Sequence, residues 1–511
     1  MKHEFVIQDN IFNINTKNIQ LLIIIFFAAV LAKGAVIFPG FAIDDYPFES
    51  ATDFGNYFSQ GRYILSAIVW VVDSFGVNIT DLYFSLGIVA LFLQATLVMA
   101  IFRFVGIAAS PGAALVGAIM VSHPYLAESL TFRMGLPGYC IALIFAIISL
   151  ENITKDAIAW RTRLLAFIAT FAMLFIYQIL LNYYIVAIIF AFLMGLVLRN
   201  GSDKSLFKNN IYHERAAALA IISIMSAIAF LAIFRLGNIL GISAITSRAV
   251  MIDAGTIPER MAQLSSFLIN TYWLSEPIFF GWLKALVALM LLVSMGIIFF
   301  HVLTQNSSKN RIYSVLLVII VFLVLILVSP GLILAFKDWW PVPRVVAHIS
   351  IIIGLIFLVA DSCIPILQNV ILKLFILVSR FLVLIGFIFL SNQIFADQQR
   401  LNRWDDMMAN RIISRLEMQP NFINTRLVYI NGGSYGYPEK LRTMNGDMNI
   451  SAFFPASSKI HLLSHVSGYK FDMANGPKAE TGEIYCKTKQ PWPHAESVIV
   501  DNDLIIICLK K

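Results

Sequence analysis

Eleven long hydrophobic stretches alternate with short polar segments over the first 395 residues of the chain. A transmembrane helix needs roughly 20 consecutive apolar residues, so the pattern predicts an all-α polytopic membrane protein with about 11 spans, whose bundle covers residues 1–395. The predicted spans are residues 19–41, 80–102, 105–122, 136–150, 163–180, 182–198, 216–235, 278–302, 313–335, 343–361 and 372–395.

The composition agrees with this pattern and excludes a soluble enzyme. Of the 511 residues, 59% are hydrophobic and 13% are charged, whereas a soluble domain carries about 25% charged residues. The formal net charge of +7 is ordinary for a membrane protein with cationic inner loops. It gives no reason to expect a nucleic-acid partner, so the lipid bilayer is the expected surrounding.

Lysine and arginine residues set the orientation of the bundle. With the N-terminus inside, the inner loops contain Arg103, Arg161, Arg215 and Arg311, as the positive-inside rule requires. The first stretch lacks an Ala-x-Ala cleavage site and is expected to be a retained span. The N-terminus is therefore predicted to be cytoplasmic, and the loops at 42–79, 123–135 and 236–277 lie outside.

The segment 396–511 is predicted to form a small α/β domain on the outer side. We expect a helix at 396–418, short strands at Arg426–Gly432, Lys459–Ser464 and Glu483–Lys487, and a hairpin at Val498–Leu509, where apolar runs flank a polar turn. Cys486 and Cys508 can pair in an oxidising compartment or remain buried thiols, and both alternatives stay open.

Two adjacent carboxylates, Asp44 and Asp45, lie where the first span meets its outer loop, and Arg62 follows in the same loop. Carboxylates near lipid are costly unless a cation, metal or substrate binds them. Close carboxylates also separate each other's pKa values, which can leave one of them a base near neutral pH. The alternative interpretation is a solvated loop that begins a short helix.

The other outer loops contain further polar groups at their membrane boundaries. Glu128 and Arg133 are five residues apart, too far for a pair on one helix face, so each is expected to seek another partner. Arginine suits phosphate because its planar group donates two hydrogen bonds. The remaining candidates are Arg344 at the start of a span, and Tyr177, Gln178 and Asn182 in a bend that can bind sugar hydroxyls or satisfy broken backbone.

These groups come from four separate hairpins and are predicted to share the outer face. An acidic group, several arginines and sugar-type polar groups at one membrane interface indicate a lipid-linked, phosphate-bearing substrate reached from outside. A transporter or flippase of a lipid-linked sugar is the competing hypothesis, but it is expected to place polar groups on both faces. The sequence lacks a phosphate-binding glycine-rich loop, so nucleotide-driven transport is not expected.

Several of these motifs occur in the order typical of one enzyme family. The Asp44-Asp45 pair, Gln60-Gly61-Arg62, the Glu128 to Arg133 segment, the Tyr177 to Asn182 bend and Pro343-Arg344 together resemble the serotype-converting glucosyltransferases that modify O-antigen. The sequence departs from that family at Met134-Gly135, where an acidic residue is common. The resemblance implies a GT-C-type membrane glycosyltransferase.

The resemblance also implies substrates, roles and a location. An undecaprenyl-phosphate-linked sugar, by default glucose, would be transferred with inversion to lipid-linked O-antigen at the periplasmic face of the bacterial inner membrane. A donor synthase and a flippase would be partners, and neither metal nor another cofactor is expected. Asp44 or Asp45 would be the base, with a narrow preference for Asp45. The phosphate would be bound by Arg62, Arg133 and Arg344, and the sugars by Glu128, Tyr177, Gln178 and Asn182.

Overall fold

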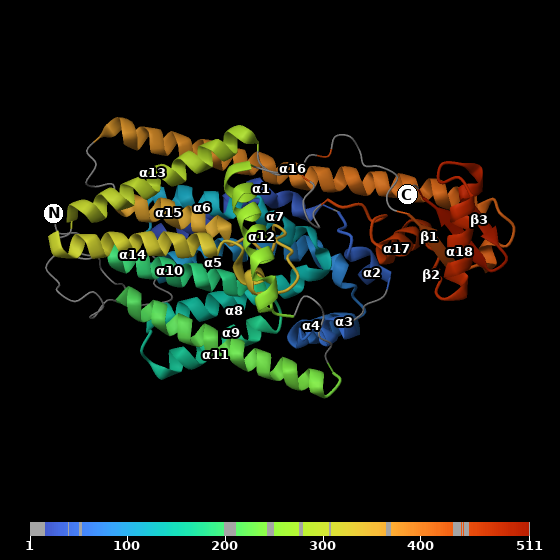
Figure 1. Ribbon diagram of the computed structural model, residues 1–511, viewed down its shortest axis with the longest axis horizontal. Helices are drawn as coiled ribbons and strands as arrows, with labels where there is room; N and C mark the ends of the chain where they lie inside the picture. Colours follow the sequence, from blue (N-terminus) through green and yellow to red (C-terminus); the bar gives the residue numbers. More distant parts are fainter. Residues whose placement is uncertain are drawn as a thin grey trace.

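The computed structural model consists of a bundle of long helices with a small sheet domain at one end (Figure 1). It describes residues 16–38, 40–50, 54–198, 211–242, 250–274, 280–305, 308–363, 369–432, 441, 443 and 449–509. We call the end of the bundle that carries the sheet domain the domain end, and the other end the opposite end.

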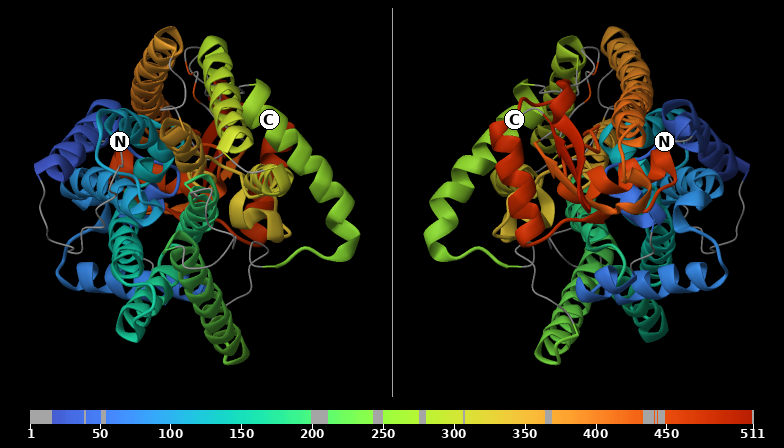
Figure 2. Two further views of the ribbon diagram at one scale, coloured as in Figure 1. Left: turned by 90° about the vertical axis from the view of Figure 1, so that its left-hand side faces the viewer. Right: turned by 90° about the vertical axis from the view of Figure 1, so that its right-hand side faces the viewer.

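Each of the eleven predicted hydrophobic stretches contains a helix. The helices are α1 (Thr16–Lys33), α5 (Tyr83–Val105), α6 (Pro111–Ser122), α8 (Leu136–Lys155), α9 (Trp160–Leu174), α10 (Leu181–Val197), α11 (Ile211–Ile239), α13 (Gly281–Gln305), α14 (Ser308–Leu327), α15 (Ile349–Cys363) and α16 (Val370–Glu417). End-on views show them gathered side by side around a common core (Figure 2).

Seven of the described helical segments are long and apolar enough to cross a membrane on their own. An eighth is obtained if α6 and the short helix α7 (Tyr125–Thr131), which are bent by 51° at His123 and Pro124, count as one broken span. The remaining apolar helices, such as α15, are shorter. Several apolar helices therefore fit a membrane protein, while the total of eleven spans stays a prediction.

Short helices collect at the domain end and fill the loops that the sequence predicts to be outside. They are α2 (Asp45–Ser50), α3 (Phe54–Ser59), α4 (Tyr63–Ser74), α7 and α12 (Ile257–Ile269), together with 3-10 turns at Gly34–Ile37, Arg133–Gly135 and Gln178–Leu180.

Local sequence signals explain where several helices begin and end. The Ser110 hydroxyl accepts a hydrogen bond from the Ala113 amide and Pro111 occupies the first turn of α6, both typical of a helix start. At the end of α5, Gly106 adopts a left-handed conformation (φ 82°) that glycine tolerates at a helix C-terminus.

The C-terminal domain has a four-stranded sheet in the order β2-β1-β4-β3. Its strands are β1 (Leu427–Asn431), β2 (Asp472–Met473), β3 (Val498–Asp501) and β4 (Leu504–Cys508). β1 is parallel to both neighbours, whereas β3 and β4 form the predicted antiparallel hairpin. Ile505 and Ile507 pack on one face of the sheet and Ile506 on the other.

Two strand predictions in this domain are wrong. Lys459–Ser464 belongs to helix α17 (Ala456–Ser467), and Glu483–Lys487 belongs to helix α18 (Pro477–Thr488). Each is a short apolar run, which periodicity cannot assign on its own. In α17, Ile460 and Leu463 share one helix face and pack in the core beneath the sheet, so tertiary packing decides the conformation.

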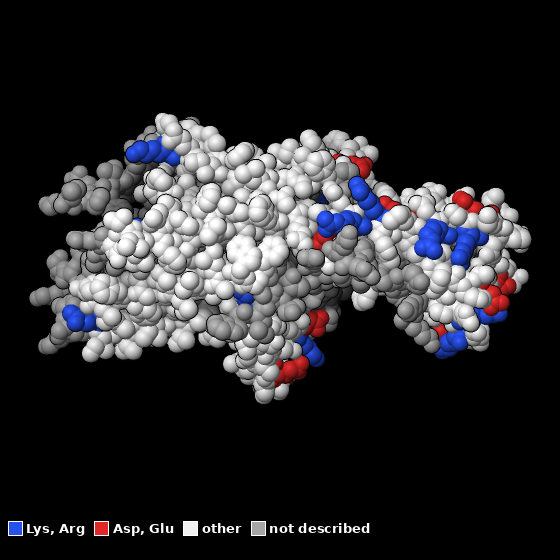
Figure 3. Space-filling view, turned by 90° about the horizontal axis from the view of Figure 1, so that it is seen from above, with Lys and Arg blue, Asp and Glu red and all other residues white. Residues whose placement is uncertain are grey.

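The predicted helix at 396–418 exists, but it is the second half of α16 and does not begin a new element. α16 runs for 48 residues from Val370 to Glu417, so the boundary at Ala396 lies inside a continuous helix that extends from the bundle into the C-terminal domain (Figure 1). Charged side chains gather over that domain, while the bundle surface in the same view is almost entirely uncharged (Figure 3).

Candidate functional site

The loops at the domain end bring together most of the polar residues that the sequence selects. α2 follows the first long helix, α7 follows α6, and Arg344 precedes α15. Since these segments are adjacent to the ends of packed helices, the bundle itself fixes their relative positions. The site therefore lies where the helical bundle meets the C-terminal domain.

Asp45 is completely buried at the start of α2 and joins two loops. One carboxylate oxygen accepts a hydrogen bond from the Ala42 amide at 2.8 Å and the other accepts one from the Met134 amide at 3.0 Å. Burial raises the pKa of Asp45 to about 7, although the backbone amides and nearby Arg133 favour its ionised form. Asp44, the neighbouring carboxylate, is only partly buried, so the two aspartates differ in accessibility.

Glu128 and Arg344 form a buried ion pair between α7 and the segment before α15. The Glu128 side chain is fully buried, and its carboxylate accepts one hydrogen bond from the Arg344 side chain at 2.9 Å and another from the Arg344 backbone amide at 2.6 Å. The guanidinium also lies over the rings of Phe132 and Trp340, which adds cation–π attraction. Glu128 thus finds the distant partner that its spacing from Arg133 predicts.

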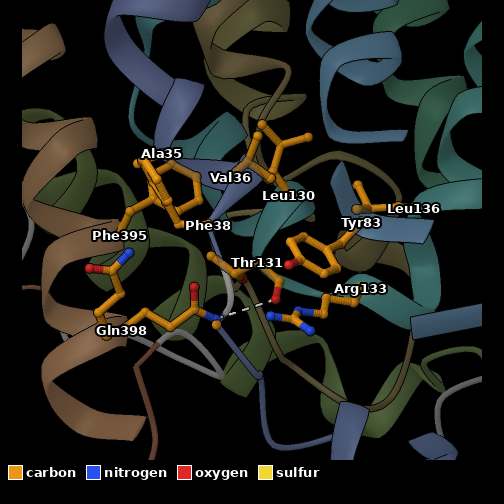
Figure 4. Close-up of a pocket in the computed structure, with 12 residues that line it drawn as sticks. Ala35, Val36, Phe38, Tyr83, Leu130, Thr131, Arg133, Leu136, Phe395 and Gln398 are labelled. Carbon is orange, nitrogen blue, oxygen red and sulfur yellow. Dashed lines mark hydrogen bonds between the residues drawn. The ribbon is translucent and has the colours of Figure 1, made fainter. Parts of the chain in front are cut away.

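Arg133 is held between two aromatic rings at the edge of a narrow pocket. Its guanidinium carbon lies 4.2 Å from the centre of the Phe41 ring and 4.0 Å from that of Tyr83. We call the space beside it the Arg133 pocket, which is lined by Ala35, Val36, Phe38, Gly40, Tyr83, Leu130, Thr131, Arg133, Leu136, Phe395, Gln398 and Gln399. Polar and apolar groups share its wall, its free volume is only about 10 Å³, and the Arg133 guanidinium points toward it (Figure 4).

Arg62 and Tyr177 connect the aspartate loop with the Glu128–Arg344 pair. Tyr177 lies within electrostatic range of Arg62, Glu128 and Arg344. Tyr57, in turn, lies within range of Arg62 and of both aspartates. Arg62 and Tyr177 are partly exposed as residues, and Arg62 interacts with the groups around both buried carboxylates.

The two amides of the predicted bend differ in their surroundings. Gln178 is partly exposed in its 3-10 turn. Asn182 is buried, donates a hydrogen bond to the Val345 carbonyl at 3.3 Å, and accepts one from the Leu332 amide at 2.9 Å. Because its amide joins the backbone next to Arg344 to the turn at Leu332, Asn182 positions the segment that carries Arg344.

The C-terminal domain and α16 hold the aspartate loop from the other side. The Asn402 side chain accepts a hydrogen bond from the Phe41 amide and donates one to its carbonyl, while the Ser458 hydroxyl of α17 donates to the Ile43 carbonyl at 2.7 Å. The rings of Phe41 and Tyr46 contact His465. The loop that carries both aspartates is therefore clamped between the bundle and the C-terminal domain.

The sequence does not identify the aromatic partners of the arginines or the role of α16. Phe41 and Tyr83 are distant from Arg133 in sequence, and nothing in the α16 sequence marks Asn402 as a contact of the first loop. Trp340 follows Trp339 in a pair that suggests an interfacial belt, but it stacks on Arg344.

The disulfide alternative is the one present in the structure. Cys486 of α18 is bonded to Cys508 of β4, with the Cα atoms 5.3 Å apart. Both residues belong to the small cluster on the sheet face remote from α17. The disulfide therefore fastens α18 to the sheet and does not touch the candidate site.

Comparison with known proteins identifies the family. The glucosyl transferase GtrII family model matches residues 34–361, which include both aspartates, the α7 segment and Arg344. The chain matches no curated protein and no solved structure. The match covers more than half of the chain and agrees with the motif order described above, so this chain belongs to the glucosyl transferase GtrII family of glycosyltransferases.

Proposed function

We propose that the protein transfers a sugar, by default glucose, from an undecaprenyl-phosphate carrier to lipid-linked O-antigen with inversion at the anomeric carbon. The observation that carries this proposal is the convergence of two aspartates and three arginines from separate loops at one end of a membrane bundle. A glucosyltransferase family supplies the reaction class, and the charges of the site support a phosphate-bearing donor.

The arginines suit the donor phosphate. Arg62 is partly exposed, Arg133 borders a narrow pocket, and Arg344 is pre-oriented by Glu128. In the transfer, the bond between the anomeric carbon and the phosphate oxygen breaks and its electron pair leaves with the polyprenyl phosphate. Fixed arginines stabilise this developing charge without having to reorganise.

Burial distinguishes the roles of the two aspartates. A general base must contact the acceptor hydroxyl whose proton it takes. Asp44 is partly exposed, whereas both carboxylate oxygens of Asp45 are buried against backbone amides. We therefore assign Asp44 as the base, which accepts the proton as the hydroxyl oxygen bonds to the anomeric carbon, and Asp45 as a positioning residue. This assignment reverses the narrow preference for Asp45 drawn from the sequence.

Burial also separates the sugar-binding candidates into contact residues and positioning residues. Tyr177 and Gln178 are partly exposed and are proposed to contact the transferred sugar. Glu128 and Asn182 are buried and act through Arg344 and its backbone. They are positioning residues in this proposal.

The proposed setting is the periplasmic face of the bacterial inner membrane, with the C-terminal domain also in the periplasm. The cationic loops predicted to be cytoplasmic support this orientation. A donor on that face has to be made and flipped by other proteins, so a donor synthase and a flippase are proposed partners. A reporter that works only in the periplasm, fused after Leu509, tests the orientation. Activity of a cytoplasmic reporter alone at the same position would contradict it.

Sugar analysis of O-antigen tests the reaction. Cells carrying the wild type, Asp44→Asn or Asp45→Asn are compared at matched protein levels in the membrane. We expect the side-branch sugar to disappear with Asp44→Asn, because no base remains, and to be reduced with Asp45→Asn. An unchanged glycan in both variants would contradict the proposal, and loss with Asp45→Asn alone would restore Asp45 as the base.

A further inference from the structure

A second cavity at the domain end lies under helix α12. α12 runs across the long axis of the bundle (Figure 1) and lies at its periphery in the end-on views, where residues 257–269 are yellow-green (Figure 2). The cavity between α12, the following turn and the segment before α15 has a volume of about 440 Å³, within the range of roughly 300–1,000 Å³ typical of small-molecule sites. We call it the α12 cavity.

The lining of the α12 cavity mixes polar and apolar groups and is neutral. Among the described residues that line it, none is charged, and its polar and aromatic groups are Tyr125, Gln263, Ser266, Phe267, Asn270, Thr271 and Trp339. Amides and hydroxyls can both donate and accept hydrogen bonds, as a sugar hydroxyl requires. The tryptophan supplies a broad apolar face against which a sugar ring can pack.

The wall of this cavity is fixed in place before any ligand binds. Arg260 of α12 is buried and donates hydrogen bonds to the carbonyls of Phe336 (2.5 Å) and Lys337 (2.8 Å). Its guanidinium carbon lies 4.7 Å from the centre of a Trp339 ring, and Phe267 meets the same indole edge-on. The indole is thus oriented by α12, which favours binding because little conformational entropy is lost.

Helix α7 separates the α12 cavity from the Arg133 pocket. Tyr125 at its beginning lines the α12 cavity, whereas Leu130 and Thr131 at its end line the Arg133 pocket. Glu128, paired with Arg344, lies between them on the same helix. The two sides of α7 therefore differ in charge and size, with a narrow pocket beside the Arg133 cation on one side and a larger, uncharged cavity on the other.

We propose that the α12 cavity binds the saccharide of the lipid-linked acceptor, while the phosphate of the donor binds on the other side of α7, at Arg133. This inference rests on the proposed function, since it assigns two substrates to that reaction. The donor phosphate needs a cation such as Arg133, whereas an uncharged sugar gains from the amides and the indole of the α12 cavity. Glu128 and Arg344 then lie where the two substrates meet.

Steady-state kinetics with both substrates tests this assignment. The purified full-length protein is assayed with radiolabelled polyprenyl-phosphate glucose as donor and the host's lipid-linked O-antigen as acceptor. We expect Trp339→Ala and Asn270→Ala to raise the acceptor KM, by roughly tenfold for the tryptophan if about 1.4 kcal/mol of binding is lost, and to leave the donor KM unchanged. Arg133→Lys should have the reverse effect.

Ser265→Ala is the matched control, because Ser265 lies on α12 but does not line the cavity. It should leave both KM values unchanged. Gln263 and Asn270 are not buried, so alanine there tests the cavity even if Trp339→Ala fails to fold. An unchanged acceptor KM in Gln263→Ala and Asn270→Ala, or a raised donor KM, would overturn the inference. If the wild type transfers no label from this donor, the proposed function itself fails.

Discussion

Two arginine–carboxylate pairs, each with one buried and one partly exposed partner, lie at the two ends of helix α15 and have different surroundings. Arg344 pairs with Glu128 at the domain end, where a guanidinium nitrogen lies 2.9 Å from a carboxylate oxygen. Arg380 pairs with Asp361 at the opposite end at 2.7 Å and also donates a hydrogen bond to the Phe357 carbonyl at 3.0 Å. Both pairs connect segments that are distant in sequence.

The comparison shows that an ion pair alone does not indicate a site. Arg380 is about 5% exposed, and its pair fastens α16 to α15. Arg344 lies beside Tyr177 within range of Arg62, with aromatic rings and cavities around it. The neighbourhood, and not the pair itself, gives Arg344 its proposed role in binding phosphate.

Conservative replacement of each arginine should separate the two roles. We expect Arg344→Lys to lower the rate of sugar transfer by about 10²-fold or more, because lysine lacks the planar group that stabilises developing charge. Arg380→Lys should keep the rate per molecule and reduce thermal stability. Transfer measured per mole of membrane-inserted protein checks this, and equal losses of rate in both variants would contradict the distinction.

Replacement of whole pairs should sharpen the same comparison. Asp361→Asn leaves the buried Arg380 without its counter-ion and should destabilise the protein by about 3–5 kcal/mol. The double variant Asp361→Leu with Arg380→Met should regain stability and retain transfer, since apolar groups of similar size often replace a buried pair without loss.

The corresponding change at the domain end should behave differently. Glu128→Leu with Arg344→Met should be tolerated by the fold but should not transfer sugar. Thermal unfolding in detergent and the transfer assay measure the two quantities independently. Activity in this double variant would mean that the Glu128–Arg344 pair is structural, like its counterpart.

Much of the bundle was predictable because hydrophobic length is a local property. All eleven predicted stretches contain helices, and the hairpin at Val498–Leu509 was correctly expected. The helices at Lys459–Ser464 and Glu483–Lys487 were not predicted, because the conformation of these short runs depends on packing that local sequence does not encode. The break of α6 and α7 at His123 and Pro124 also changes how the spans are counted.

For the candidate site, the sequence indicated which residues to consider but not which of them are buried and which are partly exposed. Asp44 and Asp45 are adjacent and chemically identical, and only the fold buries one and leaves the other partly exposed. Asn182 was predicted as a sugar contact, yet the backbone uses both ends of its amide. The α12 cavity was missed because its residues carry no charge and have no regular spacing.

The pH dependence of protein stability offers a further comparison, at the buried carboxylate of Asp45. Its pKa is raised to about 7 from 3.8, so between these values the folded state keeps a proton that the unfolded state has lost. Stability therefore falls as the pH rises from about 4 to about 7. Over this pH range the thermal midpoint should decline less steeply in Asp45→Asn than in the wild type, because asparagine does not titrate. Subtracting one profile from the other removes the contribution of the other carboxylates. Equal slopes in the two proteins would contradict the raised pKa of Asp45.

The smallest effect on transfer is expected from the disulfide, which is remote from both ion pairs. Cys486 and Cys508 lie on the sheet face away from α17, while α17 contacts the aspartate loop. Replacing both cysteines by alanine opens a loop with a sequence separation of 22 and should destabilise the C-terminal domain by about 3 kcal/mol. The rate per folded molecule should not change, because α17 and α16 hold the aspartate loop without α18. Limited proteolysis measures the first effect and the transfer assay the second. A reduced rate with an intact domain would mean that the layer containing α18 also positions Asp44.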